Sequence, residues 1–397
     1  MSMEILHKSK LHKYLVAIIL FSLYFFQVNI AERIGVSRNI FNYFILVVWA
    51  LYMFMFTPKF SKHKTELLIL LTSVIILSIR YYLDMFEETV QTLFVVIFPA
   101  LLYMVIVRNK NDVKLQLYIR KVLITFYVVN SCMAILEFIT RSHVIGWVDK
   151  VYSEGFLTFA SYSDFRAVAL AGSPLSNALL TTILNIYILF SDIKEKHKYI
   201  LFCLGLVAVM AFNARTSIVI IVFSFGLYYM KKFSQFKLEK RFFSLIGIFF
   251  MIFILLYIIL NTSMGSRLFN TESFEDDGSI AVRLKLFEEI GQLDFKQFLW
   301  GNTLSNVRFM MQTFGVLIIE NFWICYILHL GIVALFIITC LYYKLIHNVL
   351  GGYGRYESIV ISLCFIILAS SNNSLYSGYT ALFTFLLGGF AFSPLNR

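Results

Sequence analysis

Four arginines occur where a connecting loop has no evident need of a cation, two of them beside long apolar segments and two within the long loop 261–314. They are Arg166, Arg215, Arg283 and Arg308. A guanidinium stays charged at every relevant pH, and its planar fork can bind two phosphate oxygens at once. The four side chains therefore indicate a site for a phosphate-bearing substrate. The alternative for each one is an arginine that reaches lipid headgroups from a helix end.

Arg215 and Gly172 occupy the most specific positions. Arg215 ends a tight turn, 213–215, that joins two apolar segments, so its charge lies at a membrane surface or inside a helix bundle. Gly172 and Ser173 precede Pro174 at the start of another apolar segment, where exposed backbone N–H groups and the positive helix end favour an anion. The alternative there is an ordinary helix start with proline in the first turn.

Glu320 is the carboxylate best placed for acid–base chemistry. It precedes Asn321, Phe322 and Trp323, and apolar neighbours of this kind can raise a carboxyl pKa toward that of a general base. The alternative is an acid that caps a helix. Glu137 is a weaker second candidate, and Asp164 is expected to be an ion-pair or loop residue.

Two further polar features have structural interpretations. Arg80 and Asp84 are four residues apart and are expected to form an ion pair on one helix face. His329 lies well inside an apolar segment, where we expect a hydrogen bond within the bundle rather than catalysis. All five cysteines fall in apolar segments without metal-ligand spacing, so neither a metal nor a cofactor is expected.

The elements that position these residues are apolar helices. Of the 397 residues 59% are hydrophobic and only 14% charged, outside the range of soluble domains. Apolar runs of about 18 residues, enough to cross roughly 30 Å of hydrocarbon, recur along the chain. We predict an all-α fold, a polytopic transmembrane helix bundle of about twelve spans in a single membrane domain, 1–397. The spans are 13–30, 39–57, 66–83, 90–107, 117–139, 172–190, 199–212, 216–230, 242–260, 315–343, 357–371 and 376–392.

Loop charges predict the orientation. Every second loop is basic, which places the N- and C-termini in the cytoplasm and the four arginines on the outer face. The net charge of +11 therefore reflects topology, and no nucleic acid partner is expected. The two longest outer loops are 140–171 and 261–314, and in the second Ser279–Leu299 has the spacing of an amphipathic surface helix.

The motifs resemble those of the O-antigen polymerase and ligase superfamily. Arg166-Ala-Val-Ala-Leu-Ala-Gly172-Ser-Pro174-Leu-Ser-Asn177 is similar to its arginine, glycine, proline signature, and Asn213-Ala-Arg215-Thr-Ser217 resembles the next motif. Arg283, then Leu299-Trp300-Gly301, then Glu320-Asn321 in a segment that reaches Gly331, resembles the large-loop motif. The order and spacing match over about residues 160–335, and the earlier spans match only in being hydrophobic.

This resemblance implies a GT-C-like, metal-independent, inverting glycosyltransferase of the bacterial cytoplasmic membrane. Its substrate would be an undecaprenyl-pyrophosphate-linked oligosaccharide of O-antigen, capsule or exopolysaccharide synthesis, and its partners a flippase and a chain-length regulator. By the resemblance, Glu320, Arg215 and Arg283 would be catalytic. Arg166, Gly172, Arg308 and Asn321 would bind the pyrophosphate or glycan.

Three other functions stay open. Ligases of the superfamily commonly have a histidine where Glu320 stands, which favours a polymerase over an O-antigen ligase. A flippase or transporter would place ionisable groups near the bilayer midplane, but here the span centres are nearly free of charge and Pro99 is the only mid-span proline. A non-catalytic membrane scaffold would have its arginines and Glu320 scattered rather than gathered around one cavity.

Overall fold

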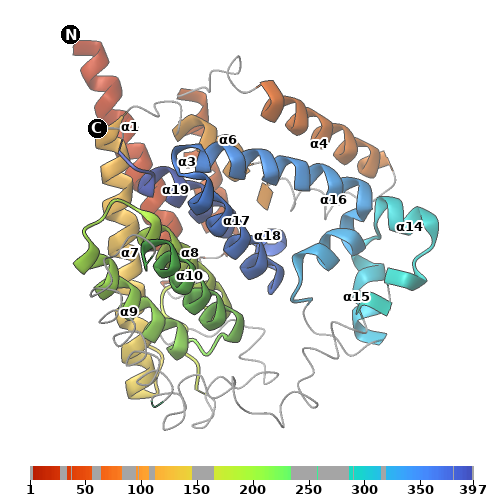
Figure 1. Cartoon of the computed structure of the whole chain (residues 1–397). Coiled ribbons are helices and arrows are strands. Elements are labelled where there is room, and N and C mark those ends of the chain that lie inside the picture. Colours follow the sequence, from red (N-terminus) through yellow and green to blue (C-terminus); the bar gives the residue numbers. More distant parts are fainter. Residues whose placement is uncertain are drawn as a thin grey trace.

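The computed structural model describes residues 3–26, 34–36, 38–55, 64–82, 95–96, 98–106, 112–144, 165–233, 257, 286–288, 290–313, 319–378 and 380–395. Within these ranges the protein is helical and has no β-strand (Figure 1). The helices are α1 (Met3–Tyr24), α3 (Arg38–Met55), α4 (Lys64–Tyr82), α6 (Phe98–Ile106), α7 (Val113–Thr140), α8 (Pro174–Phe190), α9 (Glu195–Ala211), α10 (Arg215–Phe233), α14 (Phe295–Trp300), α15 (Leu304–Thr313), α16 (Phe322–Val349), the 3-10 turn η6 (Leu350–Gly352), α17 (Arg355–Ser370), α18 (Ser374–Ser377) and α19 (Thr380–Phe392).

The predicted spans overlap with these helices, apart from 242–260, of which the structure describes only residue 257. Pro99, expected in the middle of a span, is instead the second residue of α6, where proline is tolerated because the first N–H groups of a helix have no partner. The predicted span 315–343 begins later, at Phe322, because Asn321 caps α16 with its side chain.

Three helices in the described part of the chain are long and apolar enough to cross a membrane. They are Val113–Thr140, Arg215–Phe233 and the stretch Phe322–Gly352. Shorter apolar helices are Leu11–Tyr24, Pro174–Phe190 and Thr380–Phe392. The protein therefore contains apolar helices of membrane-spanning length, as the composition indicates.

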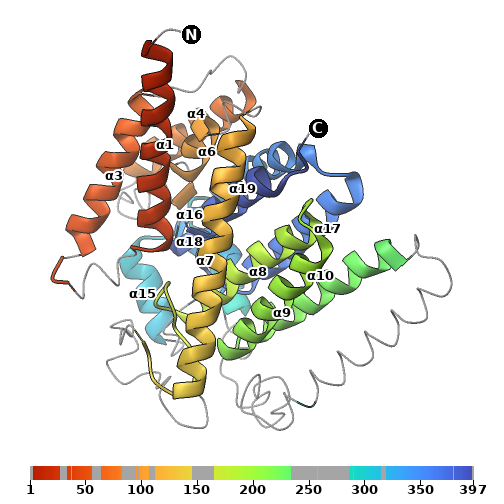
Figure 2. The ribbon, with the colours of Figure 1, turned by 90° about the vertical axis from the view of Figure 1, so that its left-hand side faces the viewer.

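Helix α7 runs along one side of the molecule and packs against α8, α9 and α19 (Figures 1 and 2). A polar seam, Tyr127, Asn130, Thr181 and Asn185, follows its contact with α8. Asn130 Nδ2 donates to Thr181 Oγ1 at 3.2 Å, and Asn185 Nδ2 donates to the Tyr127 hydroxyl at 2.8 Å. The Tyr127 hydroxyl donates in turn to the Leu201 carbonyl of α9 at 2.7 Å. Hydrogen bonds between apolar helices fix their relative rotation.

The end of α7 near the two chain termini is held by Arg120. Its Nε donates to the Ala391 carbonyl of α19 at 2.7 Å, and Nη1 lies 2.6 Å from Asp192 Oδ1 in the α8–α9 connection. A cation beside the last carbonyls of a helix is favourable because those groups carry the negative end of the helix dipole. Arg120 therefore joins three elements at the end of the molecule where both termini lie (Figures 1 and 2).

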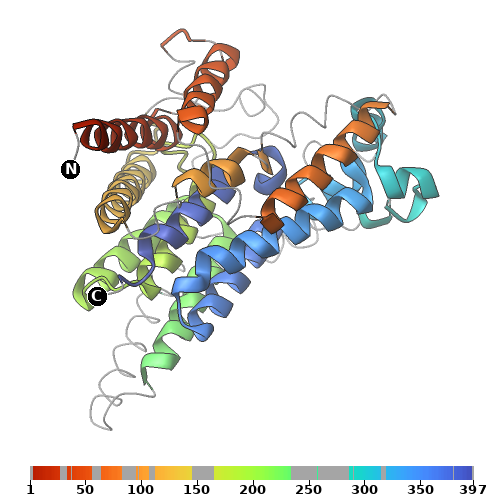
Figure 3. The ribbon, with the colours of Figure 1, turned by 90° about the horizontal axis from the view of Figure 1, so that it is seen from above.

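The far side of the molecule is built from α4, α14 and α16. Helix α4 lies along α16, and α14 packs at the bend of α16 (Figure 3). Helix α16 is broken at Gly331, whose φ is 79° and ψ 170°. Gly331 packs directly on the backbone of Leu299 and Gly301, and we call these two glycines the glycine junction. The freed Leu328 carbonyl accepts a hydrogen bond from the Asn302 N–H at 2.9 Å.

The predicted amphipathic helix over Ser279–Leu299 is not continuous. The helical turn at 286–288 and 290–292 ends before Asp294, which starts α14 with a capping box to Gln297. Leu286 is buried and Ile290 and Leu293 pack on the core, while Phe287 is exposed. Ile290 and Leu293 thus lie on the predicted apolar face, whereas Leu286 is buried in place of the expected Phe287.

Candidate functional site

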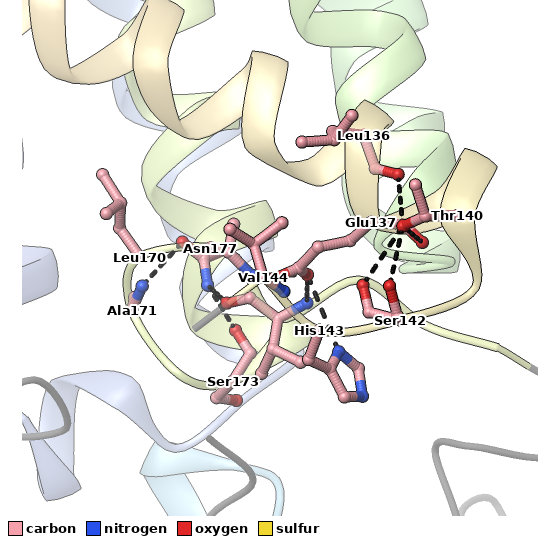
Figure 4. A network of polar contacts seen from close by, with 12 residues as sticks. Leu136, Glu137, Thr140, Ser142, His143, Val144, Leu170, Ala171, Ser173 and Asn177 are labelled. Carbon is pink, nitrogen blue, oxygen red and sulfur yellow. Dashed lines mark hydrogen bonds and ion pairs between the residues drawn. The ribbon is translucent and has the colours of Figure 1, made fainter. Parts of the chain in front are cut away.

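Residues 165–173, which we call the anchored loop, lead into α8 and are held by the buried carboxylate of Glu137 (Figure 4). Glu137 Oε2 accepts the N–H groups of Val168 at 2.7 Å and Ala169 at 3.0 Å. Its other oxygen accepts the Val144 N–H at 3.0 Å, where the chain leaves α7. Only 1% of Glu137 is exposed. These three backbone donors make Glu137 an anchor for two loops, a role unlike that of the general base considered from the sequence.

Two asparagines continue the anchoring. Asn130 Oδ1 accepts the Leu170 N–H at 3.2 Å, and Asn177 Oδ1 accepts the Ala171 N–H at 3.1 Å. Asn177 Nδ2 also donates to the carbonyls of Val168 and Ser173 (Figure 4). The backbone of the loop is thus satisfied by side chains of α7 and α8, as buried backbone groups outside regular structure must be.

The anchored loop contains two residues with positive φ. Gly172 has φ 67°, which glycine adopts without strain, and it turns the chain into α8. Ala169 has φ 38°, a conformation that costs a non-glycine residue about 1–2 kcal/mol. The hydrogen bond from Ala169 N–H to Glu137 offsets that cost. Glu137 therefore fixes the shape of the loop as well as its position.

Arg166 links this loop to the turn that contains Arg215. Its Nε donates to the Phe212 carbonyl at 3.1 Å, and the neighbouring Ala167 N–H donates to the Ala211 carbonyl at 3.1 Å. Phe212 and Asn213 form the turn between α9 and α10, and Arg215 is the first residue of α10. Two motifs that are distant in sequence are thus brought together, with the Arg166 side chain 9% exposed and Arg215 half-buried.

Asn213 stands in the same turn and was not singled out from the sequence. Its φ is 52°, and it is 2% exposed. Neither its amide oxygen nor its amide nitrogen has a hydrogen-bond partner among the described residues. Asparagine tolerates this left-handed conformation better than most residues, which explains why it occupies the turn.

The start of α8 closes the same end of the loop. Ser173 is the N-cap residue but makes no side-chain capping hydrogen bond, and Pro174 follows it. A helix start that lacks a capping side chain leaves first-turn N–H groups and the positive helix end available to an anion. Gly172, Ser173 and Arg166 all belong to the one anchored loop.

Glu320 and Asn321 lie at the beginning of α16. Glu320 is half-buried. Asn321 Oδ1 accepts the Ile324 N–H at 3.1 Å and Nδ2 donates to the Ser370 carbonyl at 3.1 Å, so this side chain caps α16 and ties it to the end of α17. The Phe322 N–H donates to the Asn372 carbonyl at 3.1 Å. The α17–α18 turn is thus fastened to the residues next to Glu320.

A cavity of about 190 Å³ separates the start of α8 from the start of α19. Ala171, Ser176 and Leu180 line one side, and Ser374, Thr380 and Ala381 line the other. Ala171 belongs to the anchored loop and Ser374 follows the turn that binds α16. The cavity therefore lies between the loop that carries Arg166 and the turn that is fastened beside Glu320.

The remaining predicted residues are placed differently. Arg308 is exposed on α15, and Arg283 lies outside the described residues, as do Asp84 and Asp164. Arg80 is buried and donates to the Trp300 carbonyl at the glycine junction. The His329 ring stacks on Tyr376 at 5.0 Å between ring centres, and its Nδ1 has no hydrogen-bond partner in the described part of the chain, unlike the hydrogen bond expected for it.

The anchoring role of Glu137, Asn130 and Asn177 was missed. One signal was present, because Asn177, Thr181 and Asn185 recur every four residues in an apolar helix and so predict a polar stripe along one face. Their partners are mostly backbone groups, which every sequence position has. No cluster of three or more His, Cys, Asp or Glu side chains that could hold a metal occurs among the described residues.

No protein-family model matches this chain, and no curated protein sequence matches it either.

Proposed function

We propose that this protein is a membrane-embedded glycosyltransferase that polymerises lipid-linked oligosaccharide repeat units at the outer face of a bacterial cytoplasmic membrane. The observation that carries the proposal is the hydrogen bond from Arg166 Nε to the Phe212 carbonyl. It joins the arginine of the anchored loop to the turn that precedes Arg215. Arg166 and Arg215 therefore lie in the same region as the uncapped start of α8 and the neutral cavity beside it.

The membrane arrangement of the proposal is the predicted bundle of about twelve spans with both termini in the cytoplasm. The described charges are consistent with it. Arg120, Lys198, Lys231 and Lys232 gather at the end of α7–α10 near the termini, and Glu137, Arg166 and Arg215 lie at the opposite end. By the positive-inside rule the latter group would lie at the outer face.

The pyrophosphate of the donor lipid would be bound by Arg166, Arg215 and the start of α8. Arg283, which follows from the resemblance to the polymerase superfamily, would join them. Negative charge grows on the pyrophosphate as its bond to the anomeric carbon breaks. Cations placed at that point therefore stabilise the transition state more than the bound substrate.

Glu320 would act as the general base. It would take the proton from a hydroxyl of the acceptor repeat unit, whose oxygen attacks the anomeric carbon with inversion while the lipid pyrophosphate leaves. The growing glycan is thereby transferred onto a new lipid-linked unit. No metal or nucleotide sugar takes part, and a flippase and a chain-length regulator would be the partners of the reaction.

The test is gel analysis of surface glycan from cells in which the chain is deleted and then replaced by variants. We expect wild type to restore the polymer ladder and Arg215→Ala to lower polymer by about 10²–10³-fold at equal protein level. Arg355→Ala is the matched control, because it removes an exposed arginine from the start of α17, and it should retain the ladder. Glu320→Gln tests the base and should abolish polymer.

Each result has a defined meaning. Loss of the ladder with single units still on the surface lipid supports a polymerase. Loss of single units as well favours a ligase or a flippase. An unchanged ladder in the deletion strain overturns the proposal.

A further inference from the structure

We infer that the cavity between α8 and α19 is the subsite for one neutral sugar ring of the lipid-linked glycan, the ring next to the pyrophosphate. The inference rests on the proposed function and adds a binding site to it. Three properties of the cavity carry it: its size, the chemistry of its lining, and its place beside the anchored loop.

The size suits one ring. At about 30 Å³ for each water, 190 Å³ corresponds to roughly six waters, a space for a single small ring rather than for a whole repeat unit. A polyprenyl chain is much longer and would need an extended groove.

The lining is neutral and amphipathic. Ser176, Ser374 and Thr380 contribute hydroxyls, Leu179, Leu180 and Ala381 contribute apolar surface, and no charged side chain of the described residues lines the cavity. A pyranose presents hydroxyls at its rim and C–H groups on its face, so it can satisfy both kinds of surface. A phosphate would find no cation there.

Two of the hydroxyls are available for a ligand. Ser374 Oγ donates to Asn372 Oδ1. Ser176 and Thr380 lie in the first turns of α8 and α19, and neither side chain makes a hydrogen bond within the described part of the chain. Both face the cavity from opposite sides. One ring between them could bond to both helices.

The cavity lies directly beside the anchored loop. Ala171 lines the cavity and belongs to the anchored loop, and the helix start proposed for the pyrophosphate lies between Ala171 and Ser176. A sugar attached directly to a pyrophosphate at that helix start is therefore within reach of the cavity. The cavity would distinguish a loaded lipid from the bare carrier.

Native mass spectrometry of the full-length protein in detergent tests this with two probes. One is undecaprenyl pyrophosphate, and the other is the same lipid with the repeat unit, extracted from cells that lack the chain. We expect wild type to bind the loaded lipid at least about tenfold more tightly, from two or three hydrogen bonds. Ala381→Leu, which fills the cavity, should remove that preference and leave bare-lipid binding unchanged. Ala50→Leu, the same change at an exposed position of α3, should have no effect.

A second variant tests the inference even if Ala381→Leu does not fold. The double change Ser176→Ala with Thr380→Val keeps side-chain volume and should lower the preference by roughly two- to tenfold for each lost hydrogen bond. Wild type that binds neither lipid contradicts the proposed function and the inference together. Three other results would overturn the sugar subsite alone. They are equal binding of both lipids by wild type, a preference for the loaded lipid that survives in both variants, and an equal loss of binding to both lipids in the variants.

Discussion

The anchored loop and the glycine junction are two places where helical geometry is interrupted inside the protein, and they are stabilised in opposite ways. At the loop, side-chain oxygens of Glu137, Asn130 and Asn177 accept backbone N–H groups. At the junction, backbone packs directly on backbone because Gly301 and Gly331 have no side chains. The anchored loop needs particular functional groups, whereas the glycine junction needs residues without side chains.

This difference has a consequence for mutation. An acceptor that serves several donors concentrates its contribution in one residue, so a single change should have a large effect. At a contact between two glycines, the effect of a substitution depends on the space for one methyl group and on the backbone conformation. Substitutions in the two regions should therefore differ in the size of their effect.

Glu137→Ala should be the most damaging change. It leaves the N–H groups of Val144, Val168 and Ala169 without an acceptor, and each orphaned buried donor costs about 1–3 kcal/mol. We expect a large fall in the melting temperature in detergent and loss of polymer. Glu137→Gln keeps one carbonyl oxygen and the side-chain shape, so its melting temperature should lie between those of wild type and Glu137→Ala. If Glu137 were instead a general base, Glu137→Gln would melt like wild type and make no polymer.

Arg166→Ala should lower polymer by about 10²–10³-fold with a smaller effect on melting. If Arg166 and Arg215 serve one pyrophosphate, the loss in the double variant should be smaller than the product of the single losses, since such residues act as a unit. Arg166→Ala combined with Gly331→Ala should show additive changes in stability, because among the described residues Arg166 bonds to Phe212 whereas Gly331 packs on Leu299 and Gly301. Additive losses for the two arginines would place them in separate sites.

Gly331→Ala should destabilise the protein by about 2–4 kcal/mol, as strain and collision combine. Its φ of 79° is unfavourable for alanine, and the new β-carbon would lie 2.6 Å from the Gly301 nitrogen. Gly226→Ala in α10 is the matched control, because its β-carbon would meet nothing within 4 Å, and it should be neutral or slightly stabilising. Equal melting temperatures for the two variants would mean that the bend in α16 does not require this contact.

The smallest effect is expected at the basic end of the molecule. Although partial burial opposes it, hydrogen bonds from Lys232 and Tyr228 lower the pKa of Glu195 below its ordinary value of 4.5. A lowered carboxyl pKa means that Glu195 stabilises the fold above pH 4.5 and loses that contribution as the pH falls through the lowered pKa. Because the side chain is about half exposed, the effect should be below about 1 kcal/mol.

The measurement is the melting temperature of Glu195→Gln against wild type across this range. A small deficit should be present at pH 7 and should shrink below pH 4.5. A deficit that is constant with pH would assign the effect to packing rather than to charge.

Sequence reasoning predicted the helices well because their signal is local. Apolar length alone placed α3, α8 and α10 within a few residues. The resemblance of the motifs implies that Arg166 and Arg215 serve one pyrophosphate, which stays a prediction, and the structure joins Arg166 to the turn before Arg215 through Phe212. The bend at Gly331 was not predicted, because glycine is tolerated within helices and its conformation here depends on Gly301, which approaches from another segment.

The role of Glu137 could be predicted even less well from the sequence. A lone glutamate near a helix end is compatible with a base, a cap or an ion pair. Besides the His143 ring 3.7 Å away, its partners are the backbone N–H groups of Val144, Val168 and Ala169, which have no sequence signature. Only the three-dimensional path of the anchored loop reveals what the carboxylate does.

The fixed shape of the anchored loop also bears on the thermodynamics of substrate capture. Holding residues 165–173 in one conformation, with Ala169 in the left-handed region, removes conformational entropy worth on the order of 10 kcal/mol. Because Glu137, Asn130 and Asn177 impose that order when the protein folds, the loop has little disorder left to lose when a ligand arrives. Binding at this face should therefore resemble association with a preorganised receptor, in which affinity is set by the contacts made rather than by the ordering of the chain.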